Sequence, residues 1–271
     1  MLDWFARNRR DMPWRSRPAP YAVWVSEIML QQTQVATVIP YFRRFIRQFP
    51  SVRRLADAHL QEVLKAWEGL GYYTRARNLH RAAREVVQYY RGRIPATAAG
   101  LQALPGVGAY TAAAIASICF NECVPVLDGN VTRVFTRFLG ISRVSTSPRV
   151  RKDILEFLGR HIPAAAPGDF NQAMMELGAM VCRPRNPDCP ACPLRHGCVA
   201  LKTGRTGSLP VQLRAKETPT VEVAAAIVRR KGKILIARRR PDQMLGGLWE
   251  FPGGKRHHGE SLMENVRREI R

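Results

Sequence analysis

Four cysteines stand close together in this chain with the spacing C-x6-C-x2-C-x5-C. They are Cys182, Cys189, Cys192 and Cys198. The segment that carries them is short and rich in proline, so it cannot bury a core of its own and must be held by what the thiols bind. Zinc sites usually pair two C-x2-C hooks, and only one occurs here. Four thiolates also suit a 4Fe-4S cluster, so the spacing favours the cluster and leaves zinc open.

From Tyr21 to about Arg160 the pattern is helical, because apolar residues recur three and four positions apart. A further helix is expected from Phe170 to Met180. Short breaks that contain Pro or Gly separate the helices at Pro40, Pro50, 69–71, 92–95, 105–108 and 125–129. Residues 202–220 are polar, basic and interrupted by Gly and Pro, so they are expected to form a linker. The sequence therefore predicts a mainly α fold before the linker.

The chain is strongly basic, with 43 Lys and Arg against 21 Asp and Glu and a formal net charge of +22. A folded protein with this balance most often binds a polyanion, and nucleic acid is the leading candidate; a basic protein without such a partner is the alternative. The run from Tyr21 to Ile39 is about as long as a membrane span, but it contains Glu27 and several Gln, Ser and Thr residues, so a core helix is expected. No signal peptide is visible, and a cytoplasmic protein without membrane contact is expected.

The stretch Leu104-Pro105-Gly106-Val107-Gly108 lies between two helical patterns. Its two glycines allow backbone N–H groups to turn toward a ligand, and the helix that opens at Ala109 adds its N-terminal dipole. Such a hairpin can bind a DNA phosphate without reading sequence. An ordinary turn between helices is the simpler interpretation, which the basic charge of the chain disfavours.

Two carboxylates are expected to lie in opposite environments. Glu27 is the only charged residue from Tyr21 to Ile39, and on one continuous helix it would share a face with Trp24, Gln31 and Gln34. Desolvation without a charged partner raises a carboxyl pKa, as a general acid requires. Asp128 directly precedes a helical pattern, and an N-cap position favours the ionised form. A neutral acid and an anion are what cleavage of a glycosidic bond needs, although spacing alone does not bring the two together.

Several segments together resemble one family. "LPGVGAYTAAAI", "VPVLDGNVTRV" and the cysteine spacing are similar to the helix-hairpin-helix DNA glycosylases that hold a 4Fe-4S cluster. "DMPWR", "WVSEIMLQQTQVATVIPYF", "GLGYYTRARNL" and "FNQAMMELGAMVC" narrow the resemblance to the MutY-type adenine glycosylases, over residues 1–200. The resemblance implies a helix-hairpin-helix glycosylase fold with an iron–sulfur cluster loop. A catalytic domain over 1–201 would then comprise a helical barrel subdomain at about 21–129 and a cluster subdomain at about 1–20 plus 130–201.

The resemblance also implies an activity, which is base-excision repair of adenine mispaired with 8-oxoguanine or guanine in double-stranded DNA, after base flipping. Glu27 resembles the acid that protonates adenine N7. Asp128 resembles the carboxylate that stabilises the oxocarbenium ion, and Asn130 belongs to the same polar site. The adenine pocket is expected to contain Trp14, Arg15 and Gln172. Contacts to DNA and the lesion base are expected from Gln32, Thr33, Leu70, Gly71, Tyr72, Leu104, Gly106, Val107 and Gly108. A monomer is expected.

Tyr110 stands where related bifunctional glycosylases place a lysine nucleophile. A phenol cannot form a Schiff base, so a monofunctional glycosylase is expected, in which Tyr110 steadies the Asp128 region. Two alternatives remain: an endonuclease III-like glycosylase and lyase acting on oxidised pyrimidines, and a non-enzymatic DNA-binding module. A nucleotide pyrophosphatase is disfavoured by the incomplete motif described next.

Residues 221–271 resemble the first part of the family's C-terminal Nudix-like domain, an α+β fold. Gly254, Glu260 and Arg268-Glu269-Ile270 fit the start of the Nudix box G-x5-E-x7-R-E-U, and the paired glutamates that would follow are not in the sequence. Pyrophosphatase activity is therefore not expected. This segment is expected to be incomplete, and residues 217–271 are expected to be partly disordered or to depend on the catalytic domain. Weaker discrimination between 8-oxoguanine and guanine, with intact excision chemistry, is a further hypothesis.

Overall fold

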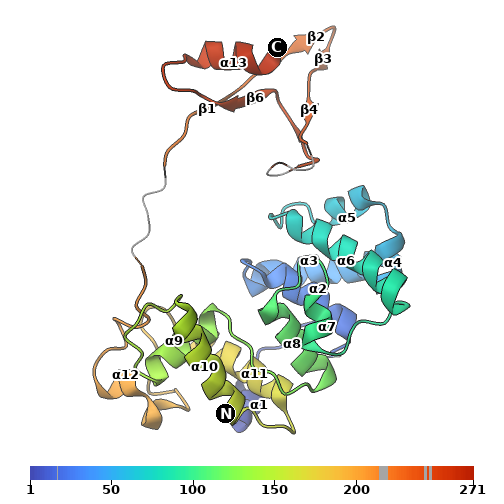
Figure 1. The fold of residues 1–271 in the computed structure, drawn as a ribbon. Helices are drawn as coiled ribbons and strands as arrows, with labels where there is room; N and C mark the ends of the chain where they lie inside the picture. The colour runs from blue at the N-terminus through green and yellow to red at the C-terminus, as the bar shows by residue number, and fades with distance from the viewer. Residues whose placement is uncertain (17, 214–218, 241–242, 244–245) are drawn as a thin grey trace. The chain divides into compact units, whose positions relative to one another are not determined.

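The structure, a computed structural model, describes residues 1–16, 18–213, 219–240, 243 and 246–271. The chain forms two compact units, 1–213 and 214–271 (Figure 1). Part of the predicted linker, residues 214–218, lies outside the described residues. In the described ranges, no helix is both long and apolar enough to cross a membrane.

The first unit is helical, as predicted. Its α-helices are α1 (Leu2–Asn8), α2 (Pro20–Leu30), α3 (Val35–Gln48), α4 (Val52–Asp57), α5 (Leu60–Ala66), α6 (Thr74–Tyr90), α7 (Ala98–Gln102), α8 (Ala109–Phe120), α9 (Gly129–Phe138), α10 (Pro148–His161), α11 (Pro167–Glu176) and α12 (Val199–Lys202). A π-helical turn (Leu177–Val181) continues α11, and a 3-10 turn (Arg195–Gly197) lies within the cysteine loop.

Two hydrophobic clusters form the core of this unit. One lies among α2 to α8 and contains the fully buried rings of Trp24 and Trp67, and the other lies among α9, α10 and α11 around Phe135. Helix α8 contributes to both clusters, Ala112 to the first and Ala113 to the second. This double burial explains why α8 is apolar on nearly every side. It also places the start of α8 where the two clusters meet.

The segment 21–39, in which Glu27 is the only charged residue, is not one helix, contrary to the prediction. α2 ends at Leu30 and α3 begins at Val35, and between them Gln32 takes the left-handed φ of 58°. Gln31 and Gln34 therefore do not share a helical face with Glu27. Glu27 stands on α2, and Gln32 and Thr33, which were expected to contact the lesion base, stand on the turn that follows this helix.

Pro40 was expected to separate two helices, but α3 continues through it to Gln48. A proline inside a helix removes one backbone donor and strains the preceding turn. The apolar side of α3 outweighs this cost, because Val38, Phe42 and Phe45 are all buried in the first cluster.

Among its described residues, the second unit combines short strands with one helix, as expected for a Nudix-like segment. Its strands form three antiparallel pairs: β1 (Val223–Ala225) with β6 (Gly253–Lys255), β2 (Arg229–Arg230) with β3 (Lys233–Ile234), and β4 (Ala237–Arg238) with β5 (Trp249–Glu250). β2 and β3 form a hairpin. Its two-residue turn is Lys231-Gly232, both with positive φ, as a type I′ hairpin turn requires.

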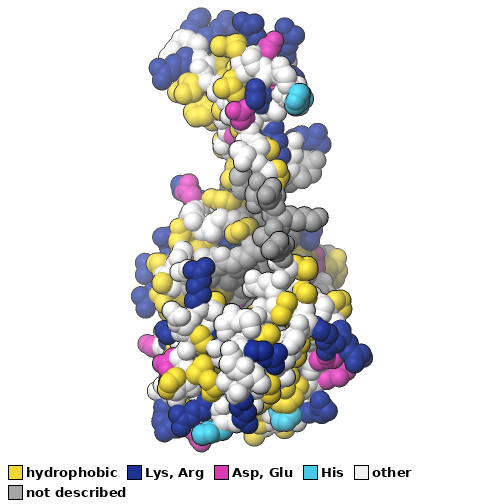
Figure 2. Space-filling model, turned by 90° about the vertical axis from the view of Figure 1, so that its left-hand side faces the viewer, with side chains coloured by type: hydrophobic (Ala, Val, Ile, Leu, Met, Phe, Trp, Pro, Cys, Tyr) yellow, Lys and Arg dark blue, Asp and Glu magenta, His cyan; other side chains and the backbone are white. Residues whose placement is uncertain are grey.

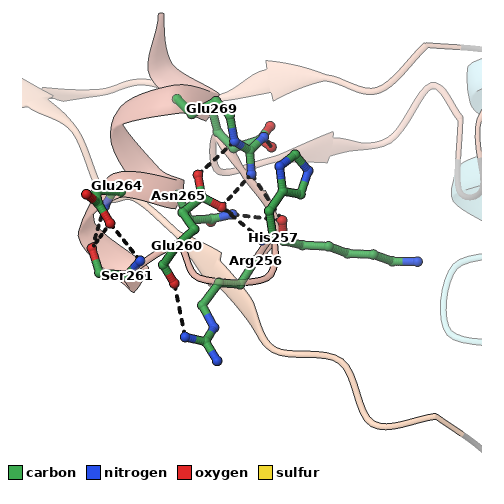
Figure 3. Close-up of polar contacts among 9 residues, drawn as sticks. Arg256, His257, Glu260, Ser261, Glu264, Asn265 and Glu269 are labelled. Carbon is green, nitrogen blue, oxygen red and sulfur yellow. Dashed lines mark hydrogen bonds and ion pairs between the residues drawn. The ribbon is translucent and has the colours of Figure 1, made fainter.

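Helix α13 (Leu262–Ile270) begins at a capping box made by Ser261 and Glu264 (Figure 3). Glu260, from the partial Nudix box, accepts hydrogen bonds from Arg268 Nε at 2.9 Å and Nη2 at 3.1 Å. These bonds from Arg268 are the largest cause that lowers the pKa of Glu260 to about 2. The pair fixes α13 beside β6, where Asn265 Nδ2 donates to the Lys255 carbonyl at 2.8 Å.

Candidate active site

A cavity of about 760 Å³ opens in the first unit. Its walls include every residue predicted for catalysis and for the base pocket: Trp14, Arg15, Glu27, Tyr110, Asp128, Asn130 and Gln172. These residues come from the N-terminal segment, α2, the start of α8, the start of α9 and α11. The fold thus brings together five segments that are distant in the sequence, in a cavity large enough for a small organic ligand.

Glu27 lies on α2, is 5% exposed, and has one oxygen, Oε2, without a hydrogen-bond partner among the described residues. Burial is the main cause that raises the pKa of Glu27 to about 7, and the charge of Asp128 adds to it. A hydrogen bond from the Tyr110 hydroxyl and the charge of Arg15 act in the opposite direction. The expected rise in the pKa is confirmed, so this carboxyl can carry a proton near neutral pH.

Asp128 caps α9, as predicted, and both of its oxygens accept hydrogen bonds. Oδ1 accepts from the Val131 N–H at 2.7 Å, and Oδ2 accepts from Asn130 Nδ2 at 3.0 Å. These bonds and the charge of Arg133 lower the Asp128 pKa, but burial raises it by more, so the net direction is upward. The prediction that capping would shift Asp128 toward the charged form is therefore wrong in net direction, because spacing did not reveal how deeply the residue is buried.

The difference between the two carboxyls lies in their hydrogen bonds. Asp128 receives donors on both oxygens, whereas Glu27 Oε2 receives none within the described part of the chain. Of the two, Glu27 is the better candidate for a proton donor and Asp128 for a stabilised anion.

Tyr110, at the start of α8, interacts with both carboxyls. Its pKa is raised well above the usual range, first by burial and then by the charges of Glu27 and Asp128. The hydroxyl also lies 3.2 Å from Met175 Sδ. A neutral phenol at this position can donate a hydrogen bond but offers no amine for covalent attack.

A buried ion-pair network holds the base-pocket residues, and sequence reasoning missed its centre, Glu176. This carboxylate is 1% exposed and accepts from Arg15 Nη1 at 2.5 Å and from Arg10 Nε at 2.8 Å. Arg15 Nε also donates to Gln172 Oε1 at 2.9 Å. Gln172 and Glu176 are four residues apart on α11, so helical spacing could have placed them on one face.

A second hollow of about 630 Å³ shares Glu27, Tyr110 and Asp128 with the main cavity. Gln32 and Tyr72 line this hollow. Tyr72 is 60% exposed, and its backbone has a left-handed φ of 49°. Thr33 lines the main cavity. Leu70 and Gly71 make the turn before Tyr72, and the Leu70 side chain is buried, so it is not available as a surface contact.

The hairpin between α7 and α8 has the predicted form. Gly106 takes a φ of 77°, and a Cβ there would come within 2.7 Å of the Asn78 Cβ, so the turn needs glycine. The side chains of Leu104 and Val107 are buried, while Gly106 and Gly108 are exposed. Only backbone groups are thus presented for a phosphate, and the two apolar side chains anchor the turn.

Lys and Arg side chains are scattered over the face of the molecule drawn in Figure 2, with fewer acidic ones among them.

The four cysteines of the loop line one small cavity of about 30 Å³. Arg137, buried and at its edge, donates to Cys182 Sγ at 3.4 Å and to the Arg183 carbonyl at 2.7 Å. Within the described ranges, no three His, Cys, Asp or Glu side chains are arranged to hold a single metal ion. The four thiols thus line one common space, and four thiolates are a donor set that a 4Fe-4S cluster or a zinc ion can use.

Arg133, a second residue that sequence reasoning missed, connects this loop to Asp128. Its Nη2 donates to Asn130 Oδ1 at 2.8 Å, and its Nε donates to the Cys182 carbonyl at 2.8 Å. Asn130 in turn donates to Asp128, so the carboxylate and the first cysteine are linked through two side chains. A basic residue five positions after the cap at Asp128 carried no signal that could have identified it.

Comparisons with known proteins agree with this arrangement. Residues 25–160 match the model of the HhH-GPD superfamily of base excision DNA repair proteins, and residues 223–271 match the NUDIX domain. Adenine DNA glycosylases from Mus musculus and Homo sapiens are 38% and 40% identical over 99% and 98% of this chain. The chain spans 63% and 59% of those two proteins. The adenine DNA glycosylase of Buchnera aphidicola subsp. Acyrthosiphon pisum is 36% identical, over 93% of this chain and 72% of its own.

Solved structures show the same fold in the first unit. A thermostable thymine-DNA glycosylase superposes with a TM-score of 0.69 at 30% identity, covering 74% of this chain and 93% of its own. An endonuclease III trapped on DNA superposes with a TM-score of 0.64 at 24% identity, over 75% and 92%. The predicted helix-hairpin-helix glycosylase fold is therefore confirmed.

Proposed function

Because this chain belongs to the adenine DNA glycosylase family of the HhH-GPD superfamily of base excision DNA repair proteins, we propose that it removes adenine mispaired with 8-oxoguanine or guanine in double-stranded DNA. The observation that carries the proposal is the unpartnered Oε2 of Glu27 in a cavity that Asp128 also lines. A proton donor and an anion at one cavity suit acid-assisted cleavage of an N-glycosidic bond.

In the proposed reaction the adenine leaves the base stack and enters the cavity, where Arg15 and Gln172 contact its edge. Glu27 gives its proton to N7, the bond between C1′ and N9 breaks, and the electron pair leaves with the base. Asp128 stabilises the positive charge that develops on the sugar. Water then adds at C1′ and gives a proton to the Glu27 carboxylate, which leaves an abasic site and restores the acid.

The protein is expected to hold the duplex through contacts to the sugar-phosphate backbone of the DNA and not through contacts to the bases. The hairpin at Gly106 and Gly108 presents N–H groups at the start of α8, as a phosphate site requires. Tyr72, exposed on a tight turn, is suited to enter the stack where the base leaves. The net charge of +22 implies binding that weakens steeply with salt.

The direct test is incubation with duplexes that contain adenine opposite 8-oxoguanine or guanine, followed by alkaline cleavage of abasic sites. Adenine release from both mispairs is expected, and no release overturns the proposal. A duplex with a G:T mispair tests the activity named for the thermostable relative. Borohydride trapping on abasic DNA tests the lyase alternative, and no trapped complex is expected because Tyr110 is not an amine. A DNA-binding module without activity would leave every duplex intact.

The rate of adenine release is expected to fall as the pH rises through about 7. Glu27 acts in its protonated form, and its pKa is raised to about 7, so the active fraction declines about tenfold per unit above that value. Asp128 acts as the anion, so a second decline is expected at lower pH, at a value raised by its burial. Single-turnover rates across the range measure both limbs. A rate that stays constant through pH 7 would contradict the role of Glu27.

We also infer that Cys182, Cys189, Cys192 and Cys198 hold a 4Fe-4S cluster, because they line a common cavity and the donor set is four thiols. The cluster would supply a rigid covalent centre for the loop, which has few buried side chains of its own. Purified protein is expected to contain about four iron atoms and matching sulfide per chain, and little zinc. Cys198→Ser is expected to lose iron, whereas Cys123→Ser, outside the loop, keeps it. Stoichiometric zinc without sulfide contradicts the inference.

A further inference from the structure

Arg75, on α6, is 8% exposed and has no ion-pair partner among the described residues. Its guanidinium instead donates to six oxygen atoms of two separate segments. Nη1 donates to the carbonyl oxygens of Ile28 (3.2 Å), Met29 (2.8 Å) and Gln31, and Nη2 donates to those of Leu70 (3.2 Å) and Gly71 (3.1 Å) and to Thr33 Oγ1 (3.2 Å). A buried cation that uses only neutral acceptors is costly, so its position calls for a reason.

The first segment is the end of α2, the helix that carries Glu27. The final carbonyls of a helix have no partners inside the helix. Gln31 is the C-cap residue of α2, and the left-handed residue Gln32 follows it. Arg75 satisfies those carbonyls and places its positive charge at the negative end of the helix dipole. The Arg75 side chain therefore caps the C-terminal end of α2, and this end lies only a few residues beyond Glu27.

The second segment is the turn that presents Tyr72. Gly71 and Tyr72 both have left-handed φ values, 75° and 49°, which are unfavourable for tyrosine and must be held by contacts. The Arg75 guanidinium lies 5.3 Å from the Tyr72 ring centroid and 5.5 Å from that of Trp67. Trp67 Nε1 donates to the Gly71 carbonyl at 3.1 Å, so the indole and the guanidinium hold the turn together.

We propose that Arg75 is a positioning residue that locks the segment at Gln31–Thr33 and the turn at Leu70–Tyr72 into one arrangement. It thereby fixes the position of Tyr72, which enters the base stack, relative to the acid Glu27. The inference rests on the proposed function, since Tyr72 and Glu27 are parts of that site. Both segments line the hollow that opens onto Glu27 and Asp128. Lysine cannot replace arginine here, because one ammonium with three donors cannot reach acceptors on both sides.

The test compares Arg75→Lys with Arg84→Lys, a matched change at an exposed position of the same helix. Extrusion of the target base is followed by the fluorescence of 2-aminopurine placed opposite 8-oxoguanine, and adenine release is followed under single-turnover conditions. Arg75→Lys is expected to lower both, release by about 100-fold, because small misplacements of catalytic groups have effects of that order. Arg84→Lys is expected to match the wild type in both.

A second comparison asks whether Arg75 acts through Tyr72. If it does, the losses in Tyr72→Ala and Arg75→Lys are less than multiplicative in the double variant, as for residues in one unit. Equal rates for Arg75→Lys and the wild type, or losses that multiply fully, overturn the inference. A wild type that releases no adenine contradicts the proposed function instead, and the fluorescence arm still tests Arg75.

Thermal unfolding is measured for each variant, so that loss of fold is separated from loss of position. If Arg75→Lys unfolds below the assay temperature, Trp67→Phe replaces it, because that change keeps the guanidinium and removes the indole beside it. Lower extrusion fluorescence in Trp67→Phe supports the inference, and unchanged fluorescence overturns it.

Discussion

Glu27→Gln is expected to reduce adenine release by about 10³-fold, within the range that general acid catalysis contributes. Glutamine keeps the size of the side chain but cannot give a proton to the leaving base. Because Glu27 is buried and its Oε2 has no partner in the described part of the chain, removing the carboxyl should not lower Tm. Single-turnover release from duplexes with adenine opposite 8-oxoguanine measures the effect.

The control for this variant is Glu62→Gln, an exposed position on α5. It should release adenine at the wild-type rate. Both variants should bind the mispaired duplex within a few-fold of the wild type, since neither side chain is assigned to a phosphate contact. Glu27→Gln with a normal rate would remove the acid from the mechanism, and weak binding with normal chemistry would assign Glu27 to the DNA interface.

Asp128→Asn is expected to reduce the rate by about 10²- to 10³-fold, the size typical for loss of one preorganised electrostatic group. Asparagine is also a good N-cap, so the bond from the Val131 N–H to position 128 can persist and α9 should stay intact. The lost element is the negative charge that faces the developing cation. The same single-turnover assay and a thermal unfolding curve measure the two consequences separately.

Asp57→Asn, at an exposed position at the end of α4, is the matched control. A large drop in Tm for Asp128→Asn would mean that the cap, and not the charge, limits the enzyme. A normal rate with a normal Tm would show that the anion is dispensable.

The pH profile adds an independent check on both assignments. In Glu27→Gln the high-pH decline near 7 should disappear from the residual rate, whereas in Asp128→Asn it should remain. This pattern separates the two carboxyls, and in Asp128→Asn the decline should lie at a lower pH, because the charge of Asp128 raises the pKa of Glu27.

The sequence by itself was enough for the helical first unit, the hairpin at Gly106 and the cap at Asp128. Each depends on local rules: apolar spacing, glycine at a positive φ, and an acceptor before a helix. The cysteine spacing likewise pointed to one centre, and the four side chains do line one cavity. The raised pKa of Glu27 followed from the absence of charged residues near it in the sequence.

Only the tertiary structure decided how the site is built, because its parts interact across large separations in the chain. Glu176 pairs with Arg10 and Arg15, which lie more than 150 positions earlier in the sequence. Arg75 donates to the carbonyls of Ile28 and Met29 at the end of α2, a contact that no spacing rule within residues 21–39 could indicate. The direction of the Asp128 pKa depends on burial, a property of the packed core and not of the cap. Local sequence thus fixes which residues can do chemistry, and long-range packing fixes their charge and their neighbours.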